Sequence, residues 1–496
     1  MTSLRNSDWV HSVRPSAVRE ALAENAYDGR MPLSRRSAAD ARPNAIALAR
    51  ARLDGAELLD LSDSNPTRHG LTDPAVSEVL ARAASREPSY DPDPRGSVRA
   101  REALAARFGG APDDYWLTPG TSTAYAWLFA LLTDVGDQVA VPRPGYPLVE
   151  PLARLAGVGT VPYPAYYLHP HGWEYDLDAL TDAVDPSCHA ALGHASHAAP
   201  DSDHCHVARS RSIHRPGPGS CDDAQDDVRG RRTRAVVVVH PNNPTGAYAD
   251  AALAAACPGV PLIVDEVFWP FWLRDVRAAA SPERPGCQGA SCGEPSNSRL
   301  SIPPRLSGAT ETLTFGLDGL SKLLAAPHLK LGWIRVSGPR AETAAAAPVL
   351  DRIADAYLPV SGPLADALPD LLDLADATVA RVRTRLLANL ATAQRVFSGA
   401  PANATDARRA DGLAYRVRRA DGGWTVLVDV PRLLPDDDLV VALLGQGLAV
   451  HPGWLYDLDS PGTLALSLLP RPDAFAVGCD RLQAALAAPG RPSVQV

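Results

Sequence analysis

Four consecutive valines lead into a turn rich in proline and asparagine, in the stretch Ala235-Val-Val-Val-Val-His-Pro-Asn-Asn-Pro-Thr-Gly246. A short apolar run of β-branched residues is typical of a strand buried on both faces of a parallel sheet. The prolines and the glycine fix a turn at the carboxyl end of that strand, where open α/β sheets bind ligands. The Asn243 amide can therefore donate a hydrogen bond to a ligand oxygen, although a rigid turn capped by asparagine side chains would have the same sequence.

A second buried strand is expected at Leu262-Ile-Val264, and it ends in Asp265. The Asp265 carboxylate can pair with a protonated ring nitrogen, or it can serve as an ordinary helix N-cap. Further short strands near 116–117 and 139–141 alternate with helical patterns such as 124–132. This rotation of strand, loop and helix predicts an α/β fold with a mostly parallel central sheet covered by helices.

The pattern changes after Gly338, so we expect a large domain over 58–338 and a smaller α+β domain over 339–496. The smaller domain is predicted to contain a hairpin closed by Asp421-Gly-Gly423. Its expected helices are 341–357, 378–397, 438–444 and a last helix from 473, and its expected strands are 415–419, 424–429, 448–451 and 464–468.

Two stretches of the large domain, about 187–232 and 281–307, lack apolar periodicity and are predicted to be irregular insertions. Residues 1–57 form an expected N-terminal extension and arm, of which 1–30 are dispensable if translation starts at Met31. The segment His204-Cys-His206 lacks the paired ligand spacing of a zinc module, so we expect no metal site.

The composition excludes several classes of protein. The 496 residues carry a formal net charge of −9, which is the wrong sign for a nucleic-acid-binding surface. No apolar run reaches the length of a membrane span, and the first residues lack the apolar core of a secretory signal. The seven cysteines are irregularly spaced without a CxxC pair, so we expect a reducing, cytoplasmic setting.

Lysine is almost absent from this chain. Among 48 basic residues only Lys322 and Lys330 are lysines, and both lie in Gly319-Leu-Ser-Lys-Leu-Leu-Ala-Ala-Pro-His-Leu-Lys-Leu-Gly-Trp333. A lysine amine can lose its proton in a protein and attack a carbonyl, whereas a guanidinium stays protonated. The Ser-Lys pair therefore indicates a Schiff base with an aldehyde; two lysines left by chance on a solvated face are the alternative.

A further ligand-binding signal is Thr118-Pro-Gly-Thr-Ser-Thr123, which lies between an expected strand and an expected helix. Backbone amides and hydroxyl groups at a helix N-terminus suit a phosphate dianion. Most such loops are only helix caps, so the case for phosphate binding depends on the motifs that follow this segment in the chain. It is followed in turn by Asn-Pro-Thr-Gly, by a strand-end aspartate and by Ser-Lys.

This order of motifs resembles the class I/II aminotransferases, fold-type I enzymes related to aspartate aminotransferase that use pyridoxal 5'-phosphate (PLP). The resemblance covers roughly 35–275 and 308–485. It implies that Lys322 forms the internal aldimine with PLP and later moves a proton, and that Asp265 pairs with the pyridine nitrogen. It also implies that Asn243 bonds the 3' oxygen and that Tyr146 stacks on the ring.

The resemblance assigns the remaining contacts as well. The phosphate would be held by four hydroxyl-bearing residues and one basic residue, which are Thr121, Ser122, Thr123, Ser321 and Lys330. Tyr90, in Tyr90-Asp-Pro-Asp-Pro-Arg-Gly96, matches a tyrosine that reaches the phosphate from the neighbouring subunit of a homodimer. Asn65, in Asn65-Pro-Thr67, matches a segment that lines the substrate pocket.

Three positions depart from the family pattern. Phe268 stands where a tyrosine usually donates to the 3' oxygen, and losing that donor should raise the pKa of the aldimine. Lys330 stands where an arginine usually binds the phosphate, and an ammonium lacks the planar fork of a guanidinium. Ala465 stands where an arginine usually binds the substrate carboxylate, and Arg471 lies beyond Pro470 and is not a direct replacement.

The sequence therefore predicts a homodimeric aminotransferase that moves an amino group from an amino acid to a 2-oxo acid by a ping-pong mechanism. A PLP-dependent lyase or decarboxylase and a catalytically silent PLP-binding protein stay open, because the motifs do not show which bond at Cα is broken. A chain whose two irregular stretches disturb folding is a further alternative. Ala465 leaves the substrate class open.

Overall fold

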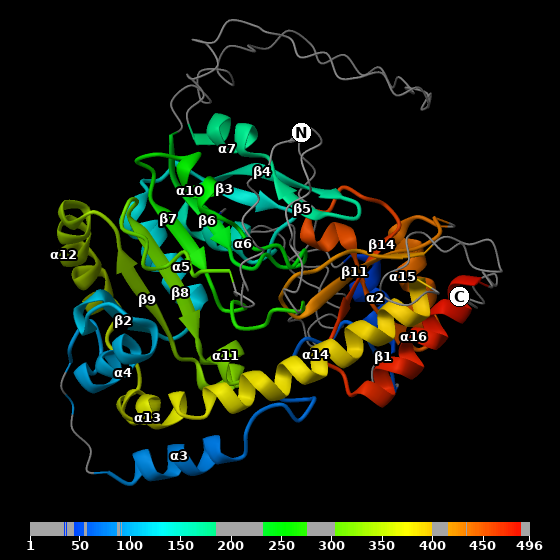
Figure 1. Cartoon of the computed structure of the whole chain (residues 1–496), viewed down its shortest axis with the longest axis horizontal. Helices are drawn as coiled ribbons and strands as arrows, with labels where there is room; N and C mark the ends of the chain where they lie inside the picture. Colours follow the sequence, from blue (N-terminus) through cyan, green and yellow to red (C-terminus); the bar gives the residue numbers. More distant parts are fainter. Residues whose placement is uncertain are drawn as a thin grey trace, which may run out of the picture.

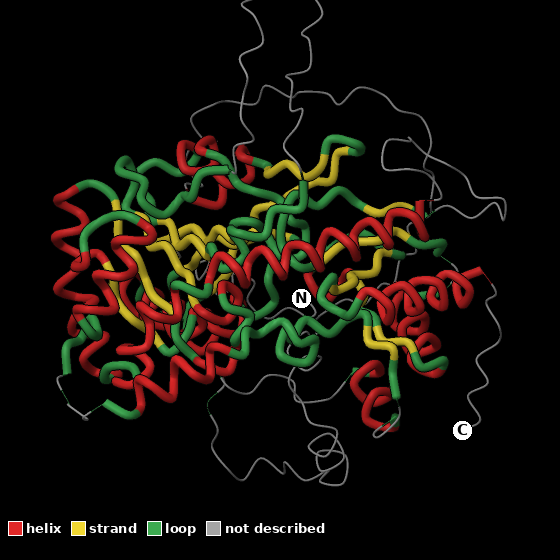
Figure 2. The backbone as a smooth tube through the Cα atoms, turned by 60° about the horizontal axis from the view of Figure 1, so that its bottom comes forward, coloured by secondary structure: helices red, strands yellow, loops and turns green. Residues whose placement is uncertain are grey.

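The computed structural model describes residues 34, 36, 44–53, 57–86, 90, 92–184, 232–274, 303–398, 415–432 and 434–487. Most of the two expected insertions, the extension 1–30 with Met31, and the His204-Cys-His206 segment lie outside these residues. The described part contains a large and a small sheet, both flanked by helices (Figure 1, Figure 2).

The large sheet has the strand order β2-β9-β8-β7-β6-β3-β4-β5. The central strands β8, β7, β6, β3 and β4 are parallel, and the pairs β2–β9, β9–β8 and β4–β5 are antiparallel. The expected mostly parallel sheet is therefore confirmed. The bounds are β2 Tyr115–Thr118, β3 Gln138–Arg143, β4 Gly159–Leu168, β5 Gly172–Tyr175, β6 Thr233–Val239, β7 Leu262–Asp265, β8 Thr314–Gly319 and β9 Gly332–Ser337.

Helices cover both faces of the large sheet. They are α3 (Ala75–Ala84), α4 (Val98–Phe108), α5 (Thr121–Leu132), α6 (Val149–Ala156), α7 (Leu177–Val184), α10 (Ala251–Ala255), α11 (Leu320–Leu323), α12 (Arg340–Tyr357) and α13 (Gly362–Leu372). On one face, Val237 and Ile263 pack with α5, α6 and α12. On the other face, Val236 and Val264 pack with α7 and α10. Neighbouring residues of each strand thus point to opposite apolar layers, which explains why the valine run is apolar throughout.

The small sheet is antiparallel, with the order β10-β11-β14-β13. Its strands are β10 Arg416–Val417, β11 Thr425–Asp429, β13 His451–Pro452 and β14 Thr463–Ser467, and its helices are α14 Ala375–Ser398, α15 Asp436–Gly445 and α16 Pro472–Ala487. The expected hairpin is confirmed, because β10 and β11 pair antiparallel. Val426, Leu466 and Phe475 belong to the apolar core beneath this sheet.

The domain boundaries at 57/58 and 338/339 stay a proposal, because packing crosses both of them. The early elements α2 (Ala45–Arg52) and β1 (Leu59–Asp60) lie on the small part, where β1 pairs with β12 (Leu448–Ala449). The helices α12 and α13, which follow Gly338, pack instead with the large part. The long helix α14 then runs from one part to the other (Figure 1).

Several elements have weak local signals and were not expected from the sequence. These are α3, α4, α6 and α13, together with the edge hairpin β4–β5 and the strands β8 and β9. Strand β8 contains two glycines and an aspartate, and α13 contains Pro369, so tertiary packing overrides local preference in both. Within the described residues, no helix combines the length and apolar character needed to cross a membrane.

Candidate active site

The carboxyl ends of β7 and β8 place an acid and an amine in one buried region. Asp265, the last residue of β7, is 3% exposed and accepts hydrogen bonds from Tyr125 Oη at 3.2 Å and from Val267 N at 3.2 Å. The pKa of Asp265 is raised to about 7. Burial is the main cause and the charge of Asp318 adds to it, while the two hydrogen-bond donors and Lys322 act in the opposite direction. A carboxyl group that titrates near neutral pH is poised to pair with a ligand cation.

Lys322 lies in the short helix α11 that follows β8. Its Nζ atom is 4.8 Å from the ring centroid of Trp424 and 5.2 Å from that of Phe268. Burial lowers the pKa of Lys322 to about 8, with Asp265 opposing the shift and Lys330 adding to it. No hydrogen bond or ion pair from this amine reaches any residue of the described ranges. The amine is therefore held by aromatic faces and is available to a ligand.

The expected phosphate loop forms the N-terminus of α5. Gly120, which has φ of 133°, turns the chain so that Thr121, Ser122 and Thr123 make up the first helical turn. A Cβ on Gly332 would lie 3.3 Å from Gly120 Cα, so the segment after Lys322 passes directly against this helix start. Unpaired amides at a helix N-terminus carry a partial positive charge that favours a dianion.

The loop after β3 brings Tyr146 to the same region. Gly145 N donates to Tyr456 O at 3.0 Å, which anchors this loop to the small part of the molecule. Burial raises the pKa of Tyr146 to about 12, and the charge of Asp265 adds to the shift. Asn243 also faces the small part, since its Oδ1 accepts from Thr425 Oγ1 at 3.4 Å. The Asn243 amide nitrogen can therefore donate to a third group.

Residues 56–398 match the sequence profile of the family described as aminotransferase class I and II. The chain belongs to this family. The alanine aminotransferase of Mycobacterium tuberculosis is 24% identical over 308 residues, which cover 59% of this chain and 54% of that protein. The tyrosine aminotransferase of Homo sapiens is 24% identical over 298 residues, which cover 57% of this chain and 50% of that protein. The chain thus spans about half the length of these curated relatives.

Solved structures of class I and II aminotransferases share the fold. The alanine aminotransferase of Pyrococcus furiosus matches with a TM-score of 0.65 at 18% identity, covering 92% of this chain and 99% of that chain. A single mutant of the Thermus thermophilus aspartate aminotransferase matches with a TM-score of 0.63 at 22% identity, covering 92% of this chain and 100% of that chain. The family uses PLP as its cofactor.

The residues of this candidate site fit PLP chemically. A partly buried lysine amine without a polar partner in the described part suits the aldehyde, and a buried strand-end acid suits the ring nitrogen. The start of α5, with its three hydroxyl-bearing residues, suits the phosphate. Ser321 lies beside Lys322 in α11, next to the Gly332 segment that touches Gly120.

Three further expected site residues have few contacts with this region. Tyr90 is 74% exposed, so it contacts little of its own chain. Lys330 is exposed in the left-handed region with φ of 53°, although its charge still lowers the pKa of Lys322. The Asn65 carbonyl accepts from Thr67 N and Oγ1 at 3.1 and 2.8 Å, which fixes a local turn and leaves its amide nitrogen as a donor.

Four residues of the site were missed in the sequence. Tyr125 stands in an apolar helix, Trp424 and Thr425 in a predicted hairpin strand, and Arg305 in an expected irregular insertion. Each contacts the site through long-range packing, so local patterns carry no sign of it. The Asp421-Gly-Gly423 turn before Trp424 could be predicted from the sequence. Its contact with the chain after β7, through the bridge between Trp272 and Gly422, is known from the structure.

Ala465 lies in apolar surroundings. Ala465 is 1% exposed, pairs across the sheet with Leu427 and His451, and packs in a cluster with Tyr456. Arg471 points elsewhere: its side chain is 71% exposed and pairs with Asp473. Neither residue supplies a buried guanidinium to the site.

Proposed function

We propose that this chain is a PLP-dependent aminotransferase, which transfers an amino group from an amino acid to a 2-oxo acid in two half-reactions. The observation that carries this proposal is the Lys322 amine, which lies beside the rings of Phe268 and Trp424 and within the field of Asp265 at the edge of the parallel sheet. Family membership supports the same chemistry.

Lys322 is the residue to hold and move the proton at the substrate carbon. When bound, PLP supplies the electron sink for that carbon. A pKa lowered to about 8 leaves a sizeable fraction of the amine unprotonated in mildly alkaline solution, which an ordinary lysine would not have. Burial beside Phe268 and Trp424 favours the neutral form of the amine, and the attraction of the ring faces for the ammonium offsets only part of this effect.

Asp265 and Tyr125 act together as a buried hydrogen-bonded pair. Asp265 would hold the ring nitrogen in its protonated state, and the Tyr125 hydroxyl orients the carboxylate through the 3.2 Å hydrogen bond. Tyr146 would stack on the ring, and the Asn243 amide would donate to the 3' oxygen. The phosphate would be held by Thr121, Ser122, Thr123, Ser321 and Lys330.

The active form is proposed to be a homodimer. Tyr90 is 74% exposed on its own subunit, which supports a role at the neighbouring site. Asn65 is proposed to line the substrate pocket through its amide nitrogen. The relatives named as alanine and tyrosine aminotransferases support an amino acid as donor, and the apolar position of Ala465 argues for a substrate that needs no guanidinium there.

Absorbance spectroscopy of the purified chain tests this function. We expect a visible band with PLP, which one amino acid removes and the matching 2-oxo acid restores. Borohydride reduction followed by peptide mass spectrometry should find the cofactor on Lys322. Release of carbon dioxide or ammonia without amino transfer would favour a decarboxylase or lyase, and the absence of any band after addition of PLP would overturn the proposal.

A further inference from the structure

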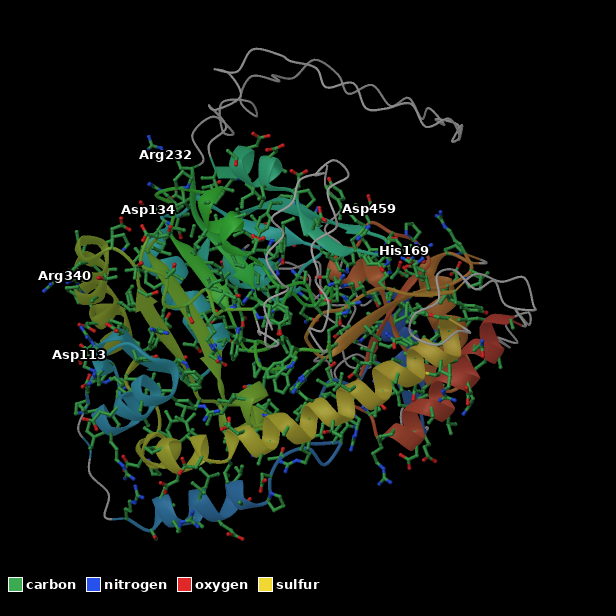
Figure 3. All side chains as sticks on the ribbon, in the orientation of Figure 1. Asp113, Asp134, His169, Arg232, Arg340 and Asp459 are labelled. Carbon is green, nitrogen blue, oxygen red and sulfur yellow. The ribbon has the colours of Figure 1, made fainter. Side chains whose placement is uncertain are left out.

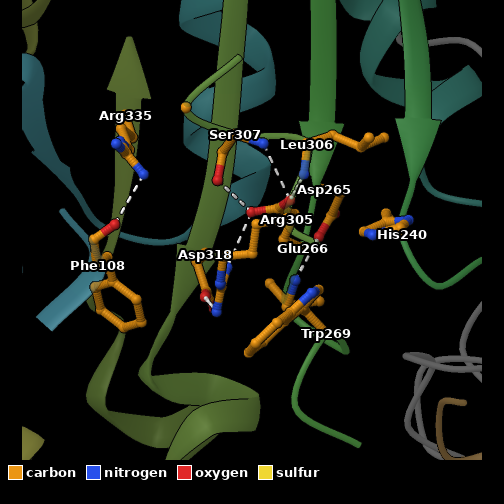
Figure 4. Close-up of polar contacts among 12 residues, drawn as sticks. Phe108, His240, Asp265, Glu266, Trp269, Arg305, Leu306, Ser307, Asp318 and Arg335 are labelled. Carbon is orange, nitrogen blue, oxygen red and sulfur yellow. Dashed lines mark hydrogen bonds and ion pairs between the residues drawn. The ribbon is translucent and has the colours of Figure 1, made fainter. Parts of the chain in front are cut away.

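A buried ion cluster lies at the strand ends that carry the reacting residues (Figure 4). The Arg305 guanidinium donates from Nη1 to Glu266 Oε2 and from Nη2 to Asp318 Oδ2, each at 2.9 Å. The side chains of Glu266 and Asp318 are 1% and 4% exposed, and that of Arg305 is 14% exposed. One guanidinium therefore joins two carboxylates that water barely reaches.

The two carboxylates have further donors that hold them in place. Glu266 Oε1 accepts from Leu306 N at 2.7 Å and from Ser307 N at 3.1 Å, and its Oε2 accepts from the Ser307 hydroxyl. Asp318 Oδ1 accepts from Gly319 N at 2.7 Å. Figure 4 shows these side chains converging on Arg305 from the ends of neighbouring strands. Buried carboxylates that are this well satisfied have little freedom to move.

Aromatic rings restrict the guanidinium as well. Its central carbon lies 4.4 Å from the ring centroid of Trp269 and 5.0 Å from that of Phe108. A planar fork between two ring faces and two carboxylates has one favourable orientation. By contrast, charged side chains such as Asp113, Asp134 and Arg340 lie at the rim of the molecule (Figure 3).

The cluster is adjacent in sequence to both reacting residues. Glu266 directly follows Asp265, and Asp318 is the penultimate residue of β8, four residues before Lys322. Strands β7 and β8 are in register there, with Asp265 opposite Leu317 and Glu266 N donating to Leu317 O at 2.8 Å. Arg305 thus ties the ends of these two strands together at the points where the Asp265 and Lys322 segments leave the sheet.

We propose that Arg305 is a positioning residue, which sets the separation between the Asp265 carboxylate and the Lys322 amine by tying Glu266 to Asp318. Its importance for catalysis rests on the proposed function, in which this acid and this amine carry the chemistry. A purely structural Arg305 would stabilise the fold and leave the electrostatic coupling between Asp265 and Lys322 unchanged. The two roles are therefore distinguishable by measuring that coupling.

The scarcity of lysine makes the coupling measurable in the full-length chain. Acetic anhydride labelling over a pH series, followed by peptide mass spectrometry, gives the protonation midpoint of Lys322, with Lys330 as the internal reference. Replacing Asp265 with asparagine removes the carboxylate that favours the ammonium, so Asp265→Asn should lower the Lys322 midpoint by about one pH unit. This shift is the coupling between the two groups.

A double-mutant cycle then tests Arg305. In the background Arg305→Met, which keeps an apolar stem against Trp269, Asp265→Asn should shift the Lys322 midpoint by less than half of that amount. Glu266→Gln, which keeps Arg305, its bond to Asp318 and the Asp318 charge that acts on Asp265, should reduce the coupling in the same direction and serves if Arg305→Met does not fold. Arg418→Met is the matched control, because Arg418 is also buried over two aromatic rings and lies beside the small sheet.

A coupling that stays at its full value in Arg305→Met and Glu266→Gln would overturn the proposal, as would an equal loss in Arg418→Met. Titration of the same proteins with PLP separates this result from the proposed function. If the unmodified chain bound no PLP, the aminotransferase proposal would fail, while the labelling cycle would still decide the role of Arg305.

Discussion

Two buried arginines in this molecule have similar local chemistry in different places. The side chains of Arg305 and Arg418 are 14% and 9% exposed, and each guanidinium lies over two aromatic rings. Arg418 donates to Asp429 at 2.8 Å and to the hydroxyls of Ser460 and Thr463 at 2.5 and 3.2 Å, all beside the small sheet. Arg305 instead joins two carboxylates at the carboxyl ends of β7 and β8.

The comparison indicates that the location of a buried ion pair relative to the strand ends decides whether it affects the chemistry of the site or only the stability of the fold. Parallel strands bring their carboxyl ends to one edge, so Arg305 lies beside the acid and the amine that we propose to react. The antiparallel small sheet has no such shared edge, and Arg418 there binds Tyr167 and Trp173 of the β4–β5 hairpin region to the small part. We therefore expect changes at the large-sheet edge to affect chemistry and changes at Arg418 to affect stability.

The largest effect on the reaction rate is expected from removing the Lys322 amine at the edge of the large sheet. Lys322→Ala should lower the transamination rate by about 10⁴-fold, because it removes the amine that we propose to move the proton. Borohydride reduction should then fix no cofactor to the protein. Lys330→Ala is the control, since it should weaken PLP binding and leave the covalent attachment intact. Attachment of cofactor to Lys330 in the wild-type chain would contradict the assignment.

Removing the acid of the same edge should have the next largest effect. Asp265→Asn keeps the shape of the side chain and its bond from Tyr125, and it removes the charge that would hold the ring nitrogen protonated. We expect kcat to fall by about 10²- to 10³-fold. Steady-state kinetics with a saturating donor measures this, and Tyr125→Phe, which keeps the carboxylate, should cost much less. Equal rates for Asp265→Asn and the unmodified enzyme would mean that Asp265 only caps the chain after β7.

The same substitution should stabilise the cofactor-free protein in a pH-dependent way. The pKa of Asp265 rises on folding from its usual 3.8 to about 7, so the folded state keeps a proton that the unfolded chain has released. Stability is therefore lost as pH rises through this window, and the full cost remains above it. Asp265→Asn should raise the free energy of unfolding more at pH 8 than at pH 4, by on the order of 3 kcal/mol. Urea denaturation at both pH values measures the gain, and a constant gain would refute the buried acid as its source.

The smallest effect on chemistry is expected in the small sheet. Arg418→Met should lower the free energy of unfolding by about 2 kcal/mol, because Asp429 loses its cation. PLP affinity and the protonation midpoint of Lys322 should stay unchanged. Chemical denaturation and the labelling experiment measure the two quantities on the same sample. A shifted Lys322 midpoint would remove the contrast between the two arginines.

Much of the framework was predictable because its signals are local. The valines of β6 and the apolar run of β7 determine buried strands, and the turns that follow them contain the prolines, asparagines and acid of the site. Ser321-Lys322 and the hydroxyl-bearing residues 121–123 could also be recognised in the sequence, because each motif consists of neighbouring residues whose types indicate their chemistry. The strands β8 and β9 were not predictable, because both contain glycine and charged residues that interrupt the apolar pattern of a buried strand.

The sequence by itself thus determined the fold class and the family and indicated the amine that we propose to react, and all three depend on residues close together in the chain. Only the tertiary structure decided which distant groups tune that amine. Tyr125 reaches Asp265 across 140 residues, Thr425 reaches Asn243 across 182, and Arg305 reaches Glu266 across 39. Such contacts form because strand ends and helix starts converge at one edge, and burial there removes the water that would otherwise screen their charges.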